Sequence, residues 1–404
     1  MRTYPIFPGQ LDWLLRLYID CHQAFLDGKP VDQALSAAFR KAKQMGSKDR
    51  RFYSTALFGL YRYWGWLLPV NRQDPMLALY LAYQLEGEIP SEIWSKRLGQ
   101  PVATAAPLGL DAKLALVLPF NAKAKLNGLV PSLMPSPDRA TLEALQARPR
   151  LWVRIQKAGP FTELLAKGQL EHQRHPLLPD AVLLDKPMDL KPYRGEVEIQ
   201  DLSSQAVGHL CAPQPGQSWL DLCAGAGGKS LHLFSLMKGQ GRLTLADPRQ
   251  EALDEAQRRF EAAQYGPVEF CWIGDDQDPL PNEAYDGVLA DVPCSGSGTW
   301  HRAPWLRWQL KEAKLGELNN QQEHILNQAA HKTKPGGLLV YSTCSILTEE
   351  NQAITANFLA RHRNFALEPY KDPISGLEQP GQHMVLPQDS GGNGMYFCRM
   401  RRHG

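Results

Sequence analysis

The second half of the chain alternates short apolar runs with amphipathic segments, and this alternation restricts the fold more than any other feature. Runs of strand length recur at Ser218–Leu222, Arg242–Ala246, Val268–Ile273, Gly287–Ala290 and Leu338–Ser342. Segments with helical spacing of apolar residues separate or follow them, at Lys229–Met237, Arg249–Ala263, Leu315–Lys332 and Thr348–Arg361. Strands that alternate with helices form a mostly parallel sheet with helices on both faces. We therefore expect an α/β domain, closed by a last strand at Met395–Met400.

The first hundred residues have a helical pattern throughout. Apolar side chains between Leu11 and Gln100 recur at helical spacing, which predicts a bundle. The aromatic residues Tyr61, Tyr63, Trp64 and Trp66 are interpreted as part of its core. A basic cluster surrounds the turn at Gly46 and is formed by Arg40, Lys41, Lys43, Lys48, Arg50 and Arg51. Two interpretations remain open for it, a solvated helix face and a contact with RNA phosphates.

The segment from 101 to 138 is rich in Ala, Pro and Leu and is interpreted as a linker. A short helix at Thr141–Leu145 and an alternating strand from Leu151 then begin a small α/β subdomain. We divide the chain into a helical domain with its linker (1–138), a connecting subdomain (139–193) and the α/β domain (194–404).

Composition excludes several classes of protein. The 404 residues are 43% hydrophobic and 21% charged, and they include no long uncharged apolar run and no pattern of a secretion signal, so a cytoplasmic location is expected. Seven cysteines without a Cys-x-x-Cys pair argue against a zinc site or a disulfide framework. Residues 1 to 150 hold 19 basic against 12 acidic side chains, a modest bias compatible with a polyanionic partner. We expect no membrane, no metal and no obligate protein partner.

Three strand ends carry residues suited to a nucleoside ligand. The first strand runs into a glycine-rich turn, Asp221 to Ser230, before a helix whose free N–H groups can face an anion. The second strand ends at Asp247, where an acid typically binds ribose hydroxyls. The third is followed by Asp275, which can reach an adenine edge. The three positions predict a pocket for S-adenosylmethionine, with NAD as the competitor.

Two cysteines at neighbouring strand ends favour methyl transfer over hydride transfer. One strand ends in Asp291-Val-Pro-Cys294 and another in Thr-Cys344-Ser. Carbon 5 of cytosine becomes nucleophilic only after a thiolate adds to carbon 6, whereas hydride transfer needs no nucleophile. A carboxyl at Asp291 is suited to hydrogen-bond ring nitrogen 3 and stabilise the charge that develops.

These motifs resemble the RsmB/Sun family of RNA 5-methylcytosine methyltransferases. By this resemblance Cys344 matches the nucleophile, Cys294 matches the thiol that assists product release, and the α/β domain is a Rossmann-like methyltransferase fold. The resemblance assigns the cofactor contacts to Asp247, Asp275, Asp291 and the loop residues Cys223, Ala224, Gly225, Ala226, Gly227, Gly228 and Lys229. The helical domain is similar to the NusB-like RNA-binding domain that precedes the catalytic domain in this family. The implied substrate is RNA, with ribosomal RNA expected.

The sequence departs from the family pattern at two places. The family's Ala-Ala-Pro-Gly-Gly-Lys-Thr loop lacks its proline here, and the family's Arg-Arg-x-Pro-Asp is replaced by His301-Arg-Ala-Pro-Trp305. Two interpretations stay open for His301, Arg302, Arg307 and Lys311, which either line an RNA path or lie on a solvated helix. A further alternative for the whole protein is a non-catalytic ribosome-assembly factor that keeps the fold and binds RNA. Retained cysteines and acids argue against it.

Overall fold

The computed structural model describes residues 8–101, 105–134, 137–274 and 279–404. The chain divides into two compact units. The helical unit contains the chain up to Arg148 together with Thr299–Glu312, and the sheet unit contains Pro149–Gly298 and Ala313–Gly404. Each unit is described by itself. Within the described ranges, no helix has both the length and the apolar character needed to cross a bilayer.

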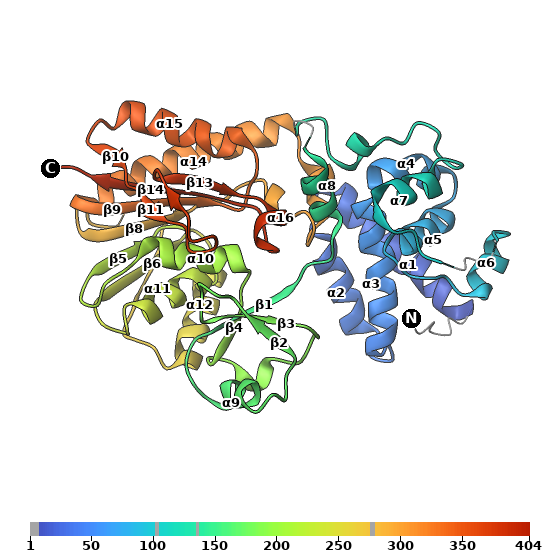
Figure 1. Cartoon of the computed structure of the whole chain (residues 1–404), viewed down its shortest axis with the longest axis horizontal. Coiled ribbons are helices and arrows are strands. Elements are labelled where there is room, and N and C mark those ends of the chain that lie inside the picture. Colours follow the sequence, from blue (N-terminus) through green and yellow to red (C-terminus); the bar gives the residue numbers. More distant parts are fainter. Residues whose placement is uncertain (1–7, 102–104, 135–136, 275–278) are drawn as a thin grey trace. The chain divides into compact units, whose positions relative to one another are not determined.

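The helical unit is a bundle of short helices, whose part before Arg148 is drawn in blue to green in Figure 1. Its helices are α1 (Pro8–Leu26), α2 (Val31–Lys41), α3 (Ser47–Arg62), α4 (Trp64–Gln73), α5 (Pro75–Leu85), α6 (Glu92–Leu98), α7 (Gly109–Val117), η1 (Leu126–Leu129), α8 (Arg139–Gln146) and α13 (Leu306–Gln309). The side chain of Asp74 accepts hydrogen bonds from the N–H groups of Met76 and Leu77, and Pro75 occupies the first helical turn, so α5 begins there. Tyr61, Tyr63, Trp64 and Trp66 are buried, which confirms the prediction that they belong to the core.

The prediction that residues 101 to 138 form a plain linker is wrong for much of that segment. Helices α7 and η1 lie within it, and Leu110, Val117 and Leu129 are buried. The indole N–H of Trp66 donates to the carbonyl of Lys125 at 2.7 Å. Alanines and prolines favour short helices with abrupt ends here, and the buried leucines attach them to the bundle.

A segment distant in sequence completes the helical unit. Arg307, on α13, is fully buried and donates to the carbonyls of Leu129 (2.8 Å) and Leu145 (3.0 Å). His301 is 6% exposed, and its carbonyl accepts a hydrogen bond from Arg62. Both interpretations offered for Arg307 and His301, an RNA path and a solvated helix, are therefore wrong. Arg302, in contrast, is exposed.

The sheet unit begins with a small antiparallel sheet in the order β2-β3-β1-β4. Its strands are β1 (Leu151–Ile155), β2 (His172–Arg174), β3 (Ala181–Leu184) and β4 (Val197–Ile199), with helix α9 (Pro160–Ala166) and the turn η2 (Lys191–Tyr193) between them. Val153, Val182 and Val197 meet Phe161 of α9 in one apolar cluster. Branched residues at alternate positions thus give this sheet a core of its own.

The main sheet has the order β10-β14-β9-β8-β5-β6-β7, with β13 paired to β14. Its strands are β5 (Ser218–Asp221), β6 (Arg242–Asp247), β7 (Glu269–Trp272), β8 (Tyr285–Asp291), β9 (Thr333–Thr343), β10 (Phe365–Leu367), β13 (Gln382–Val385) and β14 (Met395–Arg402), and β11 (Tyr370–Lys371) pairs with β12 (Glu378–Gln379) outside it. Strands β5 to β9 pair in parallel, whereas β14 runs antiparallel to β9. The predicted parallel sheet and its closing strand are confirmed.

Helices cover both faces of this sheet (Figure 1). Helices α10 (Leu202–Cys211), α11 (Gly228–Leu236) and α12 (Gln250–Ala263) pack on one face, and α14 (Glu312–Lys332) and α15 (Gln352–Arg361) pack on the other. The remaining short helices are η3 (Ser297–Thr299), η4 (Thr348–Glu350) and α16 (Pro387–Ser390). Helix α10 was not predicted, although Asp201 marks its start by accepting from the N–H of Ser203.

Replacing Arg307 with Met should destabilise the helical unit by about 3 kcal/mol, because several buried carbonyls lose their donor. Urea unfolding of the full chain, followed by tryptophan fluorescence, measures this effect. Arg302→Met, on the same segment but exposed, is the matched control and should leave the midpoint nearly unchanged. Equal midpoints for the two variants would show that Arg307 does not stabilise the unit.

Candidate active site

A cavity of about 620 Å³ lies at the carboxyl ends of the parallel strands in the sheet unit. Its walls come from the turn after β5, from the ends of β6 and β8 and the residues after them, from Ile273 after β7, and from α14. Ligands of open α/β sheets bind at this edge, where the strand order reverses. The predicted residues that line the cavity are Cys223, Ala224, Gly225, Asp247 and Asp291.

The turn after β5 brings the chain close to the cavity. Gly225 and Gly227 have positive φ angles of 52° and 76°, a conformation that side chains with a Cβ rarely adopt. A Cβ on Gly227 would also lie 2.9 Å from the Cβ of Ala256. Gly228 begins α11 directly afterwards, so the helix start with its free N–H groups belongs to the same turn as Ala226. The loop keeps its tight turn without the family's proline.

Asp247, at the end of β6, is held from two sides. Its carboxylate accepts from the N–H of Gly225 at 2.8 Å and from the Arg249 side chain at 2.9 Å. Burial opposes the charged form, but the hydrogen bonds from Arg249 and Gly225 outweigh it and hold the pKa of Asp247 below its usual value. Arg249 also lines the cavity and was not predicted from the sequence.

Asp291, the last residue of β8, lies between two donors. Lys229 Nζ donates to one carboxylate oxygen at 2.7 Å and Ser342 Oγ donates to the other at 2.8 Å. Burial tends to lower the pKa of Lys229, but Asp291 and the Cys344 sulfur outweigh burial and raise it. A positive charge is therefore maintained beside both Asp291 and Cys344.

The sulfur atoms of Cys294 and Cys344 lie 3.3 Å apart, although 50 residues separate them in the sequence. The hydrogen bond with the Cys344 sulfur and burial raise the pKa of Cys294 well above its usual value. Either thiol can donate in this contact, so the pair can share one proton between its two sulfur atoms. Cys294 follows Pro293, which lines the cavity.

The turn after β8 carries Cys294 and the turn after β9 carries Cys344, and we call these two turns the cysteine loops. Further contacts, which the sequence did not reveal, join them. The N–H of Gly298 donates to the carbonyl of Cys344 at 2.9 Å, and the hydroxyls of Ser297 and Ser345 lie 2.9 Å apart. A Cβ on Gly298 would lie 2.0 Å from the carbonyl oxygen of Gly394, so only glycine permits this approach. The repeated Ser-Gly of the Pro-Cys motif was the available signal.

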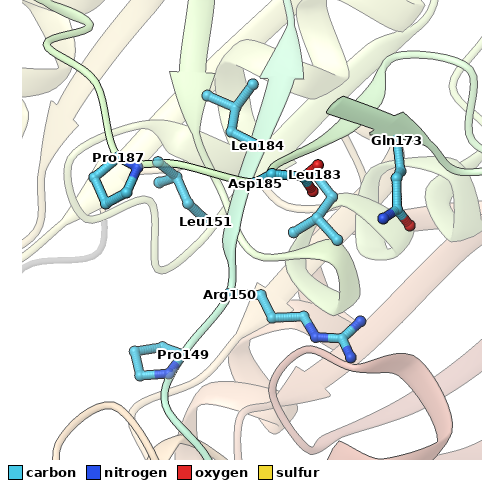
Figure 2. A pocket seen from close by; sticks show the side chains of 8 residues that line it. All are labelled: Pro149, Arg150, Leu151, Gln173, Leu183, Leu184, Asp185 and Pro187. Carbon is cyan, nitrogen blue, oxygen red and sulfur yellow. The ribbon is translucent and has the colours of Figure 1, made fainter. Parts of the chain in front are cut away.

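One predicted site residue lies outside the described part of the chain, and a further hollow lies away from the predicted site. Asp275 lies outside the described residues. A second hollow of about 480 Å³ lies on the small sheet, with Arg150, Gln173 and Asp185 among its lining side chains (Figure 2). None of the predicted site residues lines it. Among the residues that the structure describes, no group of three or more His, Cys, Asp and Glu side chains is arranged to hold a metal ion.

Known structures share this architecture. The crystal structure of PH0851 aligns with a TM-score of 0.78 at 23% identity, covering 99% of this chain and all of that one. A methyltransferase homolog protein from Pyrococcus horikoshii aligns with a TM-score of 0.56 at 22% identity, covering 65% and 90%. At these identities the likeness concerns the fold alone. The sheet order and the glycine-rich turn define a Rossmann-like α/β domain.

The sequence comparisons specify the family. Residues 209–401 match the family model described as 16S rRNA methyltransferase RsmB/F. The chain is 31% identical over 282 residues to ribosomal RNA small subunit methyltransferase B of Erwinia tasmaniensis, covering 66% of this chain and 63% of that protein. The same enzyme of Yersinia pseudotuberculosis is 31% identical over 277 residues, with equal coverage. Residues 209–401 are thus similar to the RsmB/F methyltransferase family, and the match spans about 63% of the length of these relatives.

Asp221, beneath the glycine-rich turn, is expected to make stability depend on pH. It is 1% exposed, and burial raises its pKa to about 7, although Ser230 donates to it. An aspartate has a pKa of about 3.9 in the unfolded chain. The native state therefore binds the proton of Asp221 more tightly than the unfolded state does. This protonation contributes its full stability below about pH 4, and the contribution is lost as the pH rises through about 7. The free energy of unfolding falls by at most about 1.4 kcal/mol per pH unit in this window.

Asp221→Asn should remove this loss, because the amide does not ionise. Urea midpoints of wild type and variant are measured at about pH 5 and about pH 8. The midpoint of the variant relative to that of wild type should be higher at about pH 8 than at about pH 5. Asp254→Asn, at an exposed position, is the control and should not show this change. A constant difference between wild type and Asp221→Asn at both pH values would contradict the assignment.

Proposed function

We propose that the protein transfers a methyl group from S-adenosylmethionine to carbon 5 of a cytosine in RNA, through a covalent bond to Cys344. The observation that carries the proposal is the 3.3 Å separation of two thiols, one of which directly follows Pro293 in the wall of the cavity. Methylation of nitrogen or oxygen needs no such pair, whereas carbon 5 of a pyrimidine requires a nucleophile at carbon 6. The family match to RsmB/F methyltransferases supports the same reaction class.

The residues around the cavity suit the proposed cofactor. Asp247 presents its carboxylate at the end of the second parallel strand, where ribose hydroxyls are usually bound. Gly225 and Gly227 keep the backbone close to the space, and the start of α11 provides N–H groups for a carboxylate. A volume of about 620 Å³ lies within the range of ligand sites for small molecules. When bound, S-adenosylmethionine supplies the methyl group.

Three side chains of this protein have separate roles in the proposed reaction. The Cys344 sulfur, 3.3 Å from the Cys294 sulfur and near Lys229, is the nucleophile that adds to carbon 6 as a thiolate. Asp291 is placed in this mechanism next to ring nitrogen 3, where its protonated form would donate its proton as the thiolate adds and so neutralise the negative charge pushed into the ring. Lys229, hydrogen-bonded to Asp291, supplies a positive charge beside this group. After carbon 5 accepts the methyl group, Cys294, as a thiolate once its own proton has passed to solvent, takes the proton from carbon 5. The electron pair of that bond re-forms the double bond between carbons 5 and 6 and expels Cys344 as a thiolate.

We further propose that the substrate is ribosomal RNA and that the enzyme acts in the cytoplasm. The relatives are named for the RNA of the small ribosomal subunit. The six side chains of the basic cluster around Gly46 are exposed, as a contact with phosphates requires. Cytosine in a structured RNA must leave its stack to reach a cavity of this kind. Retained RNA binding without methyl transfer in the purified protein would instead favour an assembly factor.

Substituting each cysteine tests the division of roles. Cys294→Ala should accumulate a covalent protein–RNA adduct, because release is impaired while attack proceeds. Cys344→Ala should abolish both the adduct and turnover, because the nucleophile is missing. Denaturing gel electrophoresis with a labelled transcript of small-subunit ribosomal RNA measures the adduct. The reverse pattern would exchange the two roles.

Asp247→Asn tests the cofactor site. Loss of the carboxylate should weaken binding of S-adenosylhomocysteine by about tenfold or more, measured by isothermal titration calorimetry, because a charged acceptor for two hydroxyls is lost. Asp254→Asn provides the control, since Asp254 lies exposed on α12. Unchanged affinity in Asp247→Asn would place the ribose elsewhere.

A further inference from the structure

Two consecutive residues, Glu350 and Asn351, are fully buried in the sheet unit between η4 and α15. Both carry polar side chains, and burial of a carboxylate or an amide is favourable only when hydrogen bonds compensate it. Each side chain is bonded to a different cysteine loop. The dipeptide itself is held in place, since the hydroxyl of Tyr341 donates to the carbonyl of Glu350 at 2.6 Å.

Glu350 binds the loop that carries Cys294. Its carboxylate accepts from the backbone N–H of Ser295 at 2.7 Å and from the hydroxyl of the same residue. It also accepts from Nε2 of Gln322 at 3.0 Å, and this group donates to the carbonyl of Pro293 at 2.9 Å. The main chain is therefore fixed on both sides of Cys294.

Asn351 binds the loop that carries Cys344 in a similar way. Its Oδ1 accepts from the hydroxyl of Thr343 at 2.6 Å, and its Nδ2 donates to the carbonyl of Ser345 at 2.9 Å. The hydroxyl of Thr343 in turn accepts from the N–H of Ser345 at 3.2 Å. The residues on either side of Cys344 are thus joined to one buried amide.

We propose that Glu350 and Asn351 act as a paired positioning element, in which Glu350 places Cys294 for product release and Asn351 places Cys344 for attack. The inference rests on the covalent mechanism proposed above. The chemistry of the two side chains is not interchangeable. The carboxylate of Glu350 faces three donors and so must be acceptor only, whereas Asn351 faces one donor and one acceptor and so must be an amide.

Exchanging acid and amide at each position provides a test with opposite expected results. Glu350→Gln directs N–H groups at donors and should displace the Cys294 loop, whereas Asn351→Asp directs an oxygen at the carbonyl of Ser345 and should displace Cys344. Neither exchange changes side-chain size appreciably. Glu349→Gln and Asn357→Asp make the same exchanges at exposed positions and are the matched controls.

The measurement uses two versions of one probe, a transcript of small-subunit ribosomal RNA made with cytidine or with 5-fluorocytidine. Fluorine cannot leave carbon 5 as a proton does, so the fluorinated RNA reports attack without release. The cytidine RNA accumulates adduct only when release is slow. Denaturing gels of the full-length protein with S-adenosylmethionine measure two quantities, the rate of adduct formation on fluorinated RNA and the amount of adduct that accumulates on cytidine RNA.

Glu350→Gln should form the adduct with fluorinated RNA at nearly the wild-type rate and should accumulate about tenfold or more adduct than wild type on cytidine RNA, as Cys294→Ala does. Asn351→Asp should form the fluorinated adduct about tenfold or more slowly and accumulate none. The two controls should behave as wild type. Loss of both quantities in Glu350→Gln, or accumulation in Asn351→Asp, would overturn the inference.

A milder variant keeps the test decisive if Glu350→Gln does not fold. Ser295→Ala removes one of the donors to Glu350 without leaving a charge in a new environment, and it should also raise adduct on cytidine RNA while leaving the fluorinated adduct unchanged. No accumulation in Ser295→Ala and Glu350→Gln, with accumulation in Cys294→Ala, would refute the positioning role alone. Absence of a fluorinated adduct in wild type, or its persistence in Cys344→Ala, would instead refute the proposed function.

Discussion

The parallel pairing of β8 with β9 is the constraint on which the site depends. Asp291 lies opposite Ser342 in this register, and Ser342 Oγ donates to Asp291. Both strands end at the same edge of the sheet, so Cys294 in the turn after β8 and Cys344 in the turn after β9 lie close together. A shift of one residue in either strand would reverse which side chains face the site. The separation of the two sulfur atoms is therefore a consequence of sheet register.

Hydrogen bonds between polar groups hold the strand ends and the turns after them in position at this edge. Lys229 pairs with Asp291, Gly225 binds Asp247, and the neighbouring residues Glu350 and Asn351 each bind one cysteine loop. Networks of this kind stabilise a geometry only when their members are satisfied. Asp221 shows the accompanying cost, because one of its oxygens has no hydrogen-bond partner among the described residues and its pKa is raised. Precise placement of reacting groups is obtained at some loss of stability.

Much of the fold followed from the sequence, because strand and helix periods are local properties. The five parallel strands, the closing strand at Met395 and the polar residues at strand ends were predicted from apolar spacing alone. Contacts between distant segments were not. Arg307 has the sequence context of a surface cation, but it is buried and donates to carbonyls of residues more than a hundred positions away. The contact of Arg249 with Asp247 likewise has no signal in the sequence. The alanine- and proline-rich segment before Asp138 has the pattern of a linker, because short helices stabilised by tertiary packing have weak patterns.

The central claim is that two thiols from neighbouring strands meet at one reaction site, and their oxidation measures this most directly. Mild oxidation of the native protein with diamide, followed by peptide mass mapping, should give a Cys294–Cys344 disulfide before any other pair, since the sulfur atoms need to move only about 1 Å to reach bonding distance. S-adenosylmethionine-dependent methylation should be lost in proportion and return on reduction. Formation of other disulfides while Cys294 and Cys344 stay unlinked would contradict the account.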